Sequence, residues 1–259
     1  MTANNAPVCL ITGSATGIGA ACARTFAMQG WRVALSYLDS STQADAKRVA
    51  MDCTAAGVEV LLQSLDVRDD DDCQKYAQAV LTRWGRMDAL INCAGTTRFI
   101  AHTDLAGLDA DEFHRTYDVN VVGAYQMVRA CTPALKASGQ GAVVNISSIG
   151  GVLGRGSSMA YAASKGALNT LTLSLARALA PQVRVNAIAP GFVDGGLPSR
   201  VLEKVQYAQV LATQTAAAVL QRVSQLEEVA ALAWFLTAQA PAMTGTVVMM
   251  DNGLHLNAG

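Results

Sequence analysis

Tyr161 and Lys165 stand four residues apart in the stretch YAASK. Residues at this spacing share one face of a helix, so the two side chains point to one place if the segment is helical. A phenol with a reference pKa of about 10 is a poor base at neutral pH. A nearby ammonium favours the phenolate and lowers that pKa toward neutrality, which suits general acid/base catalysis. Ser148 lies at the end of an apolar run, where its hydroxyl could meet the same substrate oxygen.

A glycine-rich stretch, TGSATGIG, follows the apolar run at 8–11. Between a strand and a helix, backbone N–H groups and the helix dipole can hold a phosphate. Gly13 would allow the tight turn, Gly17 the close approach to a pyrophosphate, and Gly19 close packing of helix on strand. The spacing G-x-x-x-G-x-G is not the commoner dinucleotide pattern. This stretch alone leaves both dinucleotide binding and a tightly packed turn open.

Composition excludes several other classes of protein. The chain has 259 residues, of which 51% are hydrophobic and 15% charged, so we expect a large core. Its net charge of −1 argues against nucleic-acid binding. Three widely separated histidines predict no metal site, and six cysteines without a C-x-x-C pair are typical of reduced thiols in the cytoplasm. The N-terminus lacks an export signal, and the uncharged stretch 205–221 is broken by Gln and Thr, so no membrane segment is expected.

Short apolar runs alternate with longer helical patterns along the whole chain, which is typical of β-α-β units. We expect strands at 8–12, 32–37, 58–64, 89–93, 142–146, 183–189 and 246–250. Helices are expected at 18–29, 41–56, from a cap at 69–72 to 84, at 111–136 and 161–179, and from a capping box at 224–227 to about 238.

This alternation predicts an α/β fold, with a doubly wound parallel sheet covered by helices on both faces. No linker or repeat interrupts it, so we expect a single domain over 1–259. Residues 192–223 form a long stretch before the last helix, and we interpret it as a substrate lid. Its apolar residues predict either a cover for a hydrophobic substrate or plain core packing.

Taken together, the motifs resemble those of the short-chain dehydrogenase/reductase family over nearly the whole chain. The matching residues occur in family order and spacing: Thr12-Gly13, Gly17, Gly19, Asp66-Val67, Asn92, Ala94-Gly95, Asn120, Ser148, Tyr161, Lys165 and Pro190-Gly191. The resemblance implies a Rossmann-type sheet of seven parallel strands in the order 3-2-1-4-5-6-7. It also implies hydride transfer between NAD(P)(H) and a carbonyl or secondary alcohol.

The resemblance implies four catalytic residues. Tyr161 would be the general acid/base, Lys165 would lower its pKa and hold the nicotinamide ribose, Ser148 would orient the substrate oxygen, and Asn120 would hold a water of the proton relay. Ser147 is the rival of Ser148, but its spacing to Tyr161 is off by one, and capping the strand is its simpler role. The implied cofactor-binding residues are Gly13, Ser14, Thr16, Gly17, Ile18, Gly19, Tyr37, Asp66, Val67, Asn92, Ala94, Gly95, Tyr161, Lys165, Pro190, Gly191 and Val193.

Three departures from the family pattern bear on the cofactor. Cys93 replaces a family asparagine, and Gly195 replaces a threonine that commonly binds the carboxamide of the nicotinamide. Ring orientation would then depend on backbone groups or on the lid. Tyr37 stands where an acidic residue usually selects NAD, although Asp39 is close enough to substitute. We therefore expect NADP(H) to be favoured over NAD(H), with NAD(H) as the alternative.

The substrate is expected to be a small carbonyl or alcohol. Beta-ketoacyl-carrier-protein reductases share these motifs, but they tend to carry basic residues where this chain has Gly139 and Gln182. A non-catalytic dinucleotide sensor would share the fold, and a sugar-nucleotide epimerase or dehydratase would share the Tyr-Lys pair. The helix at 161–179 is apolar on most sides, and so is its neighbour around 119–128, which predicts a homotetramer, or failing that a dimer.

Overall fold

In the computed structural model, which describes residues 6–257, seven parallel strands form one sheet in the order β3-β2-β1-β4-β5-β6-β7. This order and the strand direction confirm the expected Rossmann-type fold. The strands are β1 Val8–Ile11, β2 Arg32–Tyr37, β3 Val60–Ser64, β4 Ala89–Asn92, β5 Gly141–Ile146, β6 Val183–Pro190 and β7 Val247–Met250. Residues 1–5 and 258–259, the two ends of the predicted domain, lie outside the described residues. They include part of the N-terminal stretch in which no export signal is expected.

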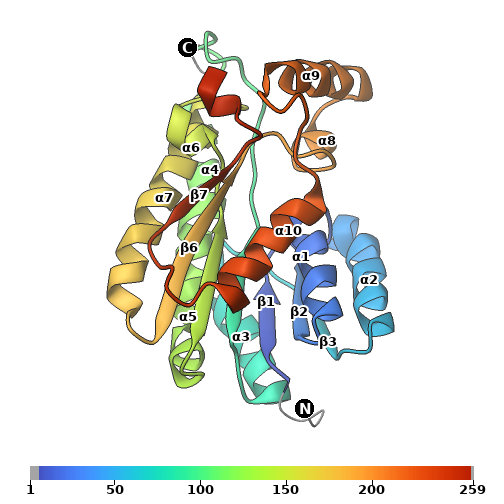
Figure 1. The fold of residues 1–259 in the computed structure, drawn as a ribbon, viewed down its shortest axis with the longest axis vertical. Coiled ribbons are helices and arrows are strands. Elements are labelled where there is room, and N and C mark those ends of the chain that lie inside the picture. Colours follow the sequence, from blue (N-terminus) through green and yellow to red (C-terminus); the bar gives the residue numbers. More distant parts are fainter. Residues whose placement is uncertain (1–5, 258–259) are drawn as a thin grey trace.

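Continuous apolar runs become strands here because helices cover both faces of the sheet. The strands β1, β4 and β5 are buried along their whole length. The helices α1 (Gly17–Met28), α2 (Ser40–Ala55) and α10 (Leu226–Trp234) cover one face, while α3 (Asp70–Trp84), α5 (Ala124–Ala137) and α7 (Met159–Leu179) cover the other (Figure 1). Each face has its own hydrophobic core, one including Phe26 and the other including Tyr76.

Helix starts follow local capping chemistry. Asp39 and Asp69 accept hydrogen bonds from the first turns of α2 and α3, as expected for acidic N-caps. The capping box of α10 was predicted one residue too early: Gln225, not Ser224, is the N-cap, and it pairs with Glu228. The Ser224 hydroxyl is used elsewhere, since it accepts a hydrogen bond from Asn252 Nδ2 at 2.9 Å. The π-helical segment η3 (Phe235–Gln239) ends this helix close to the expected position.

The helix expected over 111–136 is interrupted. It consists of α4 (Ala110–Tyr117), the π-helical segment η2 (Asp118–Gly123) and α5. The backbone at the ends of η2 keeps right-handed helical angles, so the helix widens without breaking, and hydrophobic periodicity does not reveal the change. Such π turns are frequent at functional sites, and this one contains Asn120.

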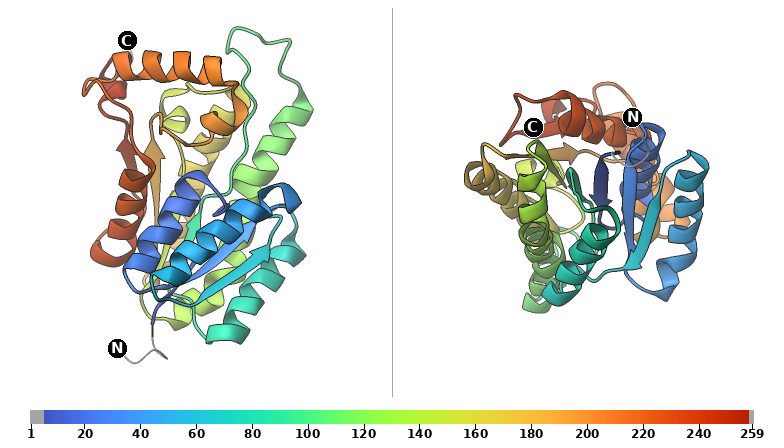
Figure 2. Two further views of the ribbon diagram at one scale, coloured as in Figure 1. Left: turned by 90° about the vertical axis from the view of Figure 1, so that its right-hand side faces the viewer. Right: turned by 90° about the horizontal axis from the view of Figure 1, so that it is seen from below.

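The stretch 192–223 folds into α8 (Pro198–Val201) and α9 (Lys204–Ala217). Figure 2 shows α9 lying across the end of the molecule opposite the N-terminus, above the carboxyl ends of the strands. Two further short helices were not predicted, α6 (Gly150–Leu153) and the 3-10 helix η4 (Leu254–Asn257). Among the described residues, no helix combines the length and apolar character that crossing a membrane requires.

Candidate active site

The glycine-rich loop connects β1 to α1 and is packed on three sides. Gly13 has a φ of +63°, and a Cβ there would lie 2.8 Å from the Ala94 Cα. A Cβ at Gly19 would lie 2.4 Å from the Gly13 carbonyl oxygen. These two glycines therefore allow close packing within the loop and against the loop after β4. Gly17 differs, because the nearest atom to a Cβ there is the carbonyl oxygen of Gly195, in the stretch 192–223, at 3.6 Å.

Side chains of neighbouring strands hold this loop in place. The Thr12 hydroxyl accepts hydrogen bonds from the backbone N–H groups of Cys93 and Ala94, both at 3.0 Å. Ser14 and Ser36 are buried. The Ser14 hydroxyl accepts the Ser36 N–H at 2.8 Å and donates to the Ser36 carbonyl at 3.2 Å, while the Ser36 hydroxyl accepts the Gly13 N–H at 3.1 Å. Sequence reasoning missed this role of Ser36, which only the pairing of β1 with β2 brings next to the loop.

The N-terminus of α1 fits an anionic group. Thr16 is its N-cap residue, but the Thr16 side chain makes no capping hydrogen bond, and the first turn contains no acidic residue. The unsatisfied N–H groups and the helix dipole therefore favour a phosphate at this point. Ile18, the second residue of the helix, packs partly buried against the core of this face.

Ser148, Tyr161 and Lys165 come together at the carboxyl end of β5. Ser158 caps α7 by accepting the Tyr161 N–H at 3.2 Å, which fixes the first turn and so the direction of the Tyr161 side chain. Lys165 is buried, and its Nζ donates to the Ile146 carbonyl at 2.8 Å and lies 5.7 Å from the centre of the Tyr161 ring. The structure thus brings together the three residues predicted from spacing.

The direction of the Tyr161 pKa differs from our expectation. Burial raises the pKa of the Tyr161 phenol to about 12, and a hydrogen bond with the Ser148 hydroxyl only partly opposes that rise. Burial lowers the pKa of Lys165 to about 8. Desolvation determines the direction of the Tyr161 pKa shift, because the Lys165 ammonium bonds the Ile146 carbonyl and not the phenol. Tyr161 is therefore protonated at neutral pH, ready to donate.

Asn120 lies beside this cluster with its amide fully oriented. Its Oδ1 accepts the Thr96 N–H at 2.9 Å, and its Nδ2 donates to the Thr96 carbonyl and to Ser164 Oγ, both at 3.0 Å. A Cβ at Gly95 would lie 3.4 Å from Asn120 Oδ1 and 3.8 Å from Lys165 Nζ. Both side chains thus lie close to Gly95.

The residues predicted to hold the adenosine lie at the ends of β2, β3 and β4. The Tyr37 hydroxyl accepts a hydrogen bond from Gln43 at 2.9 Å. Asp39 caps α2, and hydrogen bonds from Ser41 lower its pKa. Hydrogen bonding to Arg68 likewise lowers the pKa of Asp66.

Two of the predicted cofactor-binding residues have clear structural partners. Asn92 Nδ2 donates to Asn145 Oδ1 at 2.9 Å and to the Ala124 carbonyl at 3.2 Å, which joins β4, β5 and α5. The Val67 carbonyl accepts from Gln126 Nε2 at 2.7 Å. Similarly, Ser147 does more than cap β5, because its hydroxyl donates to Asn169 Oδ1 at 2.6 Å and to the Lys165 carbonyl at 3.2 Å.

The chain after β6 forms the other wall of the site. The Gly191 N–H donates to the Met250 carbonyl at 2.9 Å, Ile149 N–H donates to the Pro190 carbonyl, and Val193 forms an isolated bridge with Ser224. Gly195 has a φ of +72°, and its N–H donates to the Tyr207 hydroxyl at 2.9 Å, which itself donates to Asp194 Oδ1 at 2.6 Å. Sequence reasoning did not identify this hydroxyl as a partner of the chain after β6.

Within residues 6–257, no group of three or more His, Cys, Asp or Glu side chains is arranged to hold a metal ion. The six cysteines carry free thiols, and five of them are buried.

Comparison with known proteins agrees with this fold. A family model described as enoyl-(acyl carrier protein) reductase matches residues 13–255. The chain is 36% identical over 254 residues to a ketoacyl reductase assigned to the granaticin polyketide synthase of Streptomyces violaceoruber, covering 98% of each chain. It is 32% identical to a 3-oxoacyl-[acyl-carrier-protein] reductase of Synechocystis, covering 98% of this chain and 99% of the relative.

Solved structures show the same similarity. A protein from Burkholderia xenovorans that is assigned to the short-chain dehydrogenases/reductases superposes with a TM-score of 0.92 at 52% identity, covering 97% of this chain and 99% of that one. An NAD⁺-bound xylitol dehydrogenase superposes with a TM-score of 0.86 at 28% identity, covering 96% and 99%.

Proposed function

Since the chain belongs to the short-chain dehydrogenase/reductase family of NAD(P)-dependent oxidoreductases, we propose that Ser148, Tyr161 and Lys165 carry out its carbonyl–alcohol chemistry. The observation that carries this proposal is the meeting of these three side chains at the carboxyl end of β5. Burial raises the pKa of the Tyr161 phenol to about 12, so the phenol is protonated at neutral pH and can act as the general acid when a carbonyl is reduced.

Each residue has one role in this scheme. A nicotinamide cofactor, when bound, supplies the hydride. The Tyr161 phenol donates its proton to the substrate oxygen as negative charge develops there, and the Ser148 hydroxyl donates a hydrogen bond to the same oxygen. The Lys165 ammonium stabilises the phenolate that forms, and Asn120 helps to hold a water through which the proton returns. The residues at the N-terminus of α1, including Gly17, would hold the pyrophosphate.

A screen of carbonyls and alcohols with both cofactors tests this proposal. The reaction is monitored by the absorbance of the reduced nicotinamide. We expect oxidation of NADPH or NADH with at least one carbonyl class. Tight binding of a cofactor without turnover of any substrate would support the dinucleotide sensor instead.

Free 3-oxoacyl thioesters should lead the screen, because the relatives include ketoacyl reductases. Gly139 and Gln182 are both exposed and uncharged, which weakens the narrower alternative of a substrate delivered by an acidic carrier protein.

We also propose a cytoplasmic location, supported by the free thiols, which suit a reducing compartment.

We propose NADP(H) as the preferred cofactor. The end of β2 presents the Tyr37 hydroxyl rather than a carboxylate, and the Asp39 carboxylate is engaged by Ser41 at the start of α2. Titration should therefore show tighter binding of NADPH than of NADH. If NADH bound at least tenfold tighter, Asp39 would be the ribose acceptor, and Asp39→Ala should then reduce the preference for NADH.

We propose that 192–223 acts as the substrate lid and that Tyr207 fastens it. The Tyr207 hydroxyl bridges the Asp194 carboxylate and the Gly195 N–H. The Gly195 carbonyl oxygen would lie 3.6 Å from a Cβ at Gly17. Tyr207→Phe removes hydrogen bonds worth about 1 kcal/mol, so limited proteolysis within the lid should become about fivefold faster. Tyr125→Phe, on α5, should leave the cleavage rate unchanged. Equal cleavage rates for both variants would contradict the role of Tyr207.

We propose that the chain assembles as a homotetramer, with a dimer as the alternative. Exposed apolar side chains occur on α4, η2, α5, α6 and α7, namely Phe113, Val122, Tyr125, Val152 and Leu173. Part of the predicted helix surface is not available, because Met127 and Val128 are buried against the chain's own core. The exposed residues nevertheless provide a surface for a symmetry mate.

Light scattering should give a mass near four times 27.0 kDa. Ala167→Arg on α7 should lower it, as should Thr170→Arg, which lies in an exposed position one turn further along the same helix. Melting temperatures of the variants would show that the fold survives. A mass of 27 kDa for the unmodified protein at micromolar concentration would refute the assembly.

A further inference from the structure

An ion pair on α4 reaches beyond its own helix. Arg115 donates from Nε to Glu112 Oε2 at 3.0 Å and from Nη2 to Glu112 Oε1 at 2.6 Å. The Glu112 side chain is only 6% exposed, and the Thr116 hydroxyl donates to the same carboxylate. The pair is thus a rigid two-pronged contact and not a loose pair in solvent.

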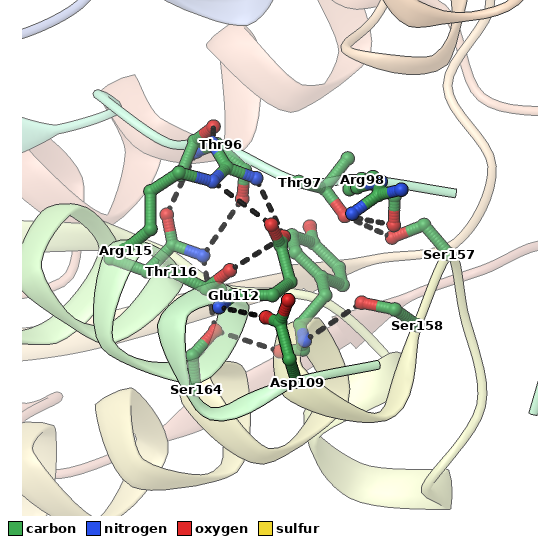
Figure 3. Close-up of polar contacts among 12 residues, drawn as sticks. Thr96, Thr97, Arg98, Asp109, Glu112, Arg115, Thr116, Ser157, Ser158 and Ser164 are labelled. Carbon is green, nitrogen blue, oxygen red and sulfur yellow. Dashed lines mark hydrogen bonds and ion pairs between the residues drawn. The ribbon is translucent and has the colours of Figure 1, made fainter. Parts of the chain in front are cut away.

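The third contact of the guanidinium leads toward the active site. Arg115 Nη1 donates to Thr96 Oγ1 at 2.7 Å, across 19 residues of sequence (Figure 3). Thr96 lies in the connection from β4 to α4, which contains no helix or strand from 93 to 109. Its residues Thr97 and Ile100 are held by Ser157, and Arg115 holds the Thr96 side chain itself.

Thr96 in turn sets the orientation of Asn120. Its backbone N–H and carbonyl bond the two ends of the Asn120 amide, and Ser164, on the far side, both accepts from that amide and donates to the Tyr161 carbonyl at 2.7 Å. Both Nδ2 hydrogens are therefore used, while Oδ1 keeps one lone pair. A flipped amide would place its NH₂ group against the Thr96 N–H.

We propose that Arg115, fixed by Glu112, is a positioning residue for Asn120 and acts through Thr96. Its effect is to keep Asn120 in place beside Gly95 and close to Lys165, where the proposed relay water would be ordered. The inference rests on the proposed function for its catalytic consequence. The competing view is that the ion pair only stabilises α4.

Three variants separate these views. Arg115→Ala removes all three contacts, Thr96→Val removes only the Oγ1 acceptor, and Arg115→Lys keeps the charge but lacks the planar fork. We expect kcat to fall about 10-fold in the first two, the lower end of what such supporting partners contribute. KM and cofactor Kd should stay within about twofold, because no substrate contact is lost. Arg115→Lys should keep stability but not restore kcat.

The solvent deuterium isotope effect on kcat gives a readout that a merely structural role would not move. It should rise in Arg115→Ala and Thr96→Val, because the proton transfer becomes slower relative to the other steps. The double variant should be no slower than the single ones, since both break the same link. The control is Arg24→Ala: the Arg24 side chain is 45% exposed, close to the 40% of Arg115, and its ion pair with Asp52 joins α1 to α2.

A second readout needs no activity. The side-chain amide signals of Asn120 in ¹⁵N NMR spectra, assigned by their loss in Asn120→Asp, should shift and exchange faster in Thr96→Val and Arg115→Ala but not in Arg24→Ala. Unchanged amide signals would overturn the proposal, and so would lower stability with unchanged kcat. If the unmodified protein reduces no substrate, the proposed function fails, while the amide signals still decide whether Arg115 positions Asn120.

Discussion

Tyr161→Phe is expected to lower turnover by about 10²–10⁴-fold, the range typical of a lost general acid. The ring stays in place, because phenylalanine keeps its shape and Ser158 still caps the first turn of α7. Only the hydroxyl is lost, and with it the proton donor and the hydrogen bond with Ser148. Cofactor affinity, measured by fluorescence titration, should hardly change. Single-turnover measurement of hydride transfer would show that the slowed step is the chemistry.

A matched control exists in the second core. Tyr76 is fully buried, and its hydroxyl has no hydrogen-bond partner. Tyr76→Phe removes the same group at no loss of a hydrogen bond, so turnover should be unchanged. A Tyr161→Phe variant that kept most of its activity would rule out Tyr161 as the acid.

The strands could be predicted closely because a two-sided sheet leaves an unambiguous signal. Runs such as VCLI at β1 are apolar at every position, and the ends of β2 agree with the prediction at both residues. The π-helical turn at η2 could not be predicted, since a single wider turn hardly alters the apolar pattern of a helix. The cap of α10 shifted because Asn252, far along the chain, engages Ser224.

The proposed catalytic cluster could be predicted from the sequence for a different reason. Tyr161 and Lys165 lie on one helix, so their spacing alone brings them together. Thr96 and Arg115 meet only because a loop folds back onto α4, and Tyr207 meets Gly195 only because the stretch 192–223 folds back on itself. The sign of the Tyr161 pKa shift likewise depends on burial, which spacing does not report.

Lys165 should make the protein less stable than a Lys165→Met variant at neutral pH, although that variant should lose both turnover and cofactor affinity. Lys165 is 4% exposed, and burial lowers its pKa from 10.5 to about 8. The difference between those values corresponds to about 3 kcal/mol of unfolding free energy. Functional sites commonly retain such costs, because the buried charge is what the chemistry needs.

The stability difference between Lys165→Met and the unmodified protein should depend on pH. Below pH 8, Lys165 is charged in both the folded and unfolded protein, and the full burial cost is present. Between pH 8 and 10.5 the folded protein loses the proton while the unfolded chain still holds it, so the unfolded state binds more protons and stability rises with pH. The stability gap between Lys165→Met and the unmodified protein should therefore narrow across that window.

Urea unfolding from pH 7 to 10.5, at one protein concentration, measures this gap. Burial raises the pKa values of Cys93 and other thiols, which lowers stability at high pH. The thiols that do not interact with Lys165 are present in both proteins, so their contribution cancels in the difference. Cys93 does interact with Lys165, so both proteins should carry Cys93→Ala. A gap that stayed constant from pH 7 to 10.5 would show that Lys165 is not desolvated in the folded protein. In that case, the position of Lys165 beside Tyr161 would not lower the stability of the folded protein.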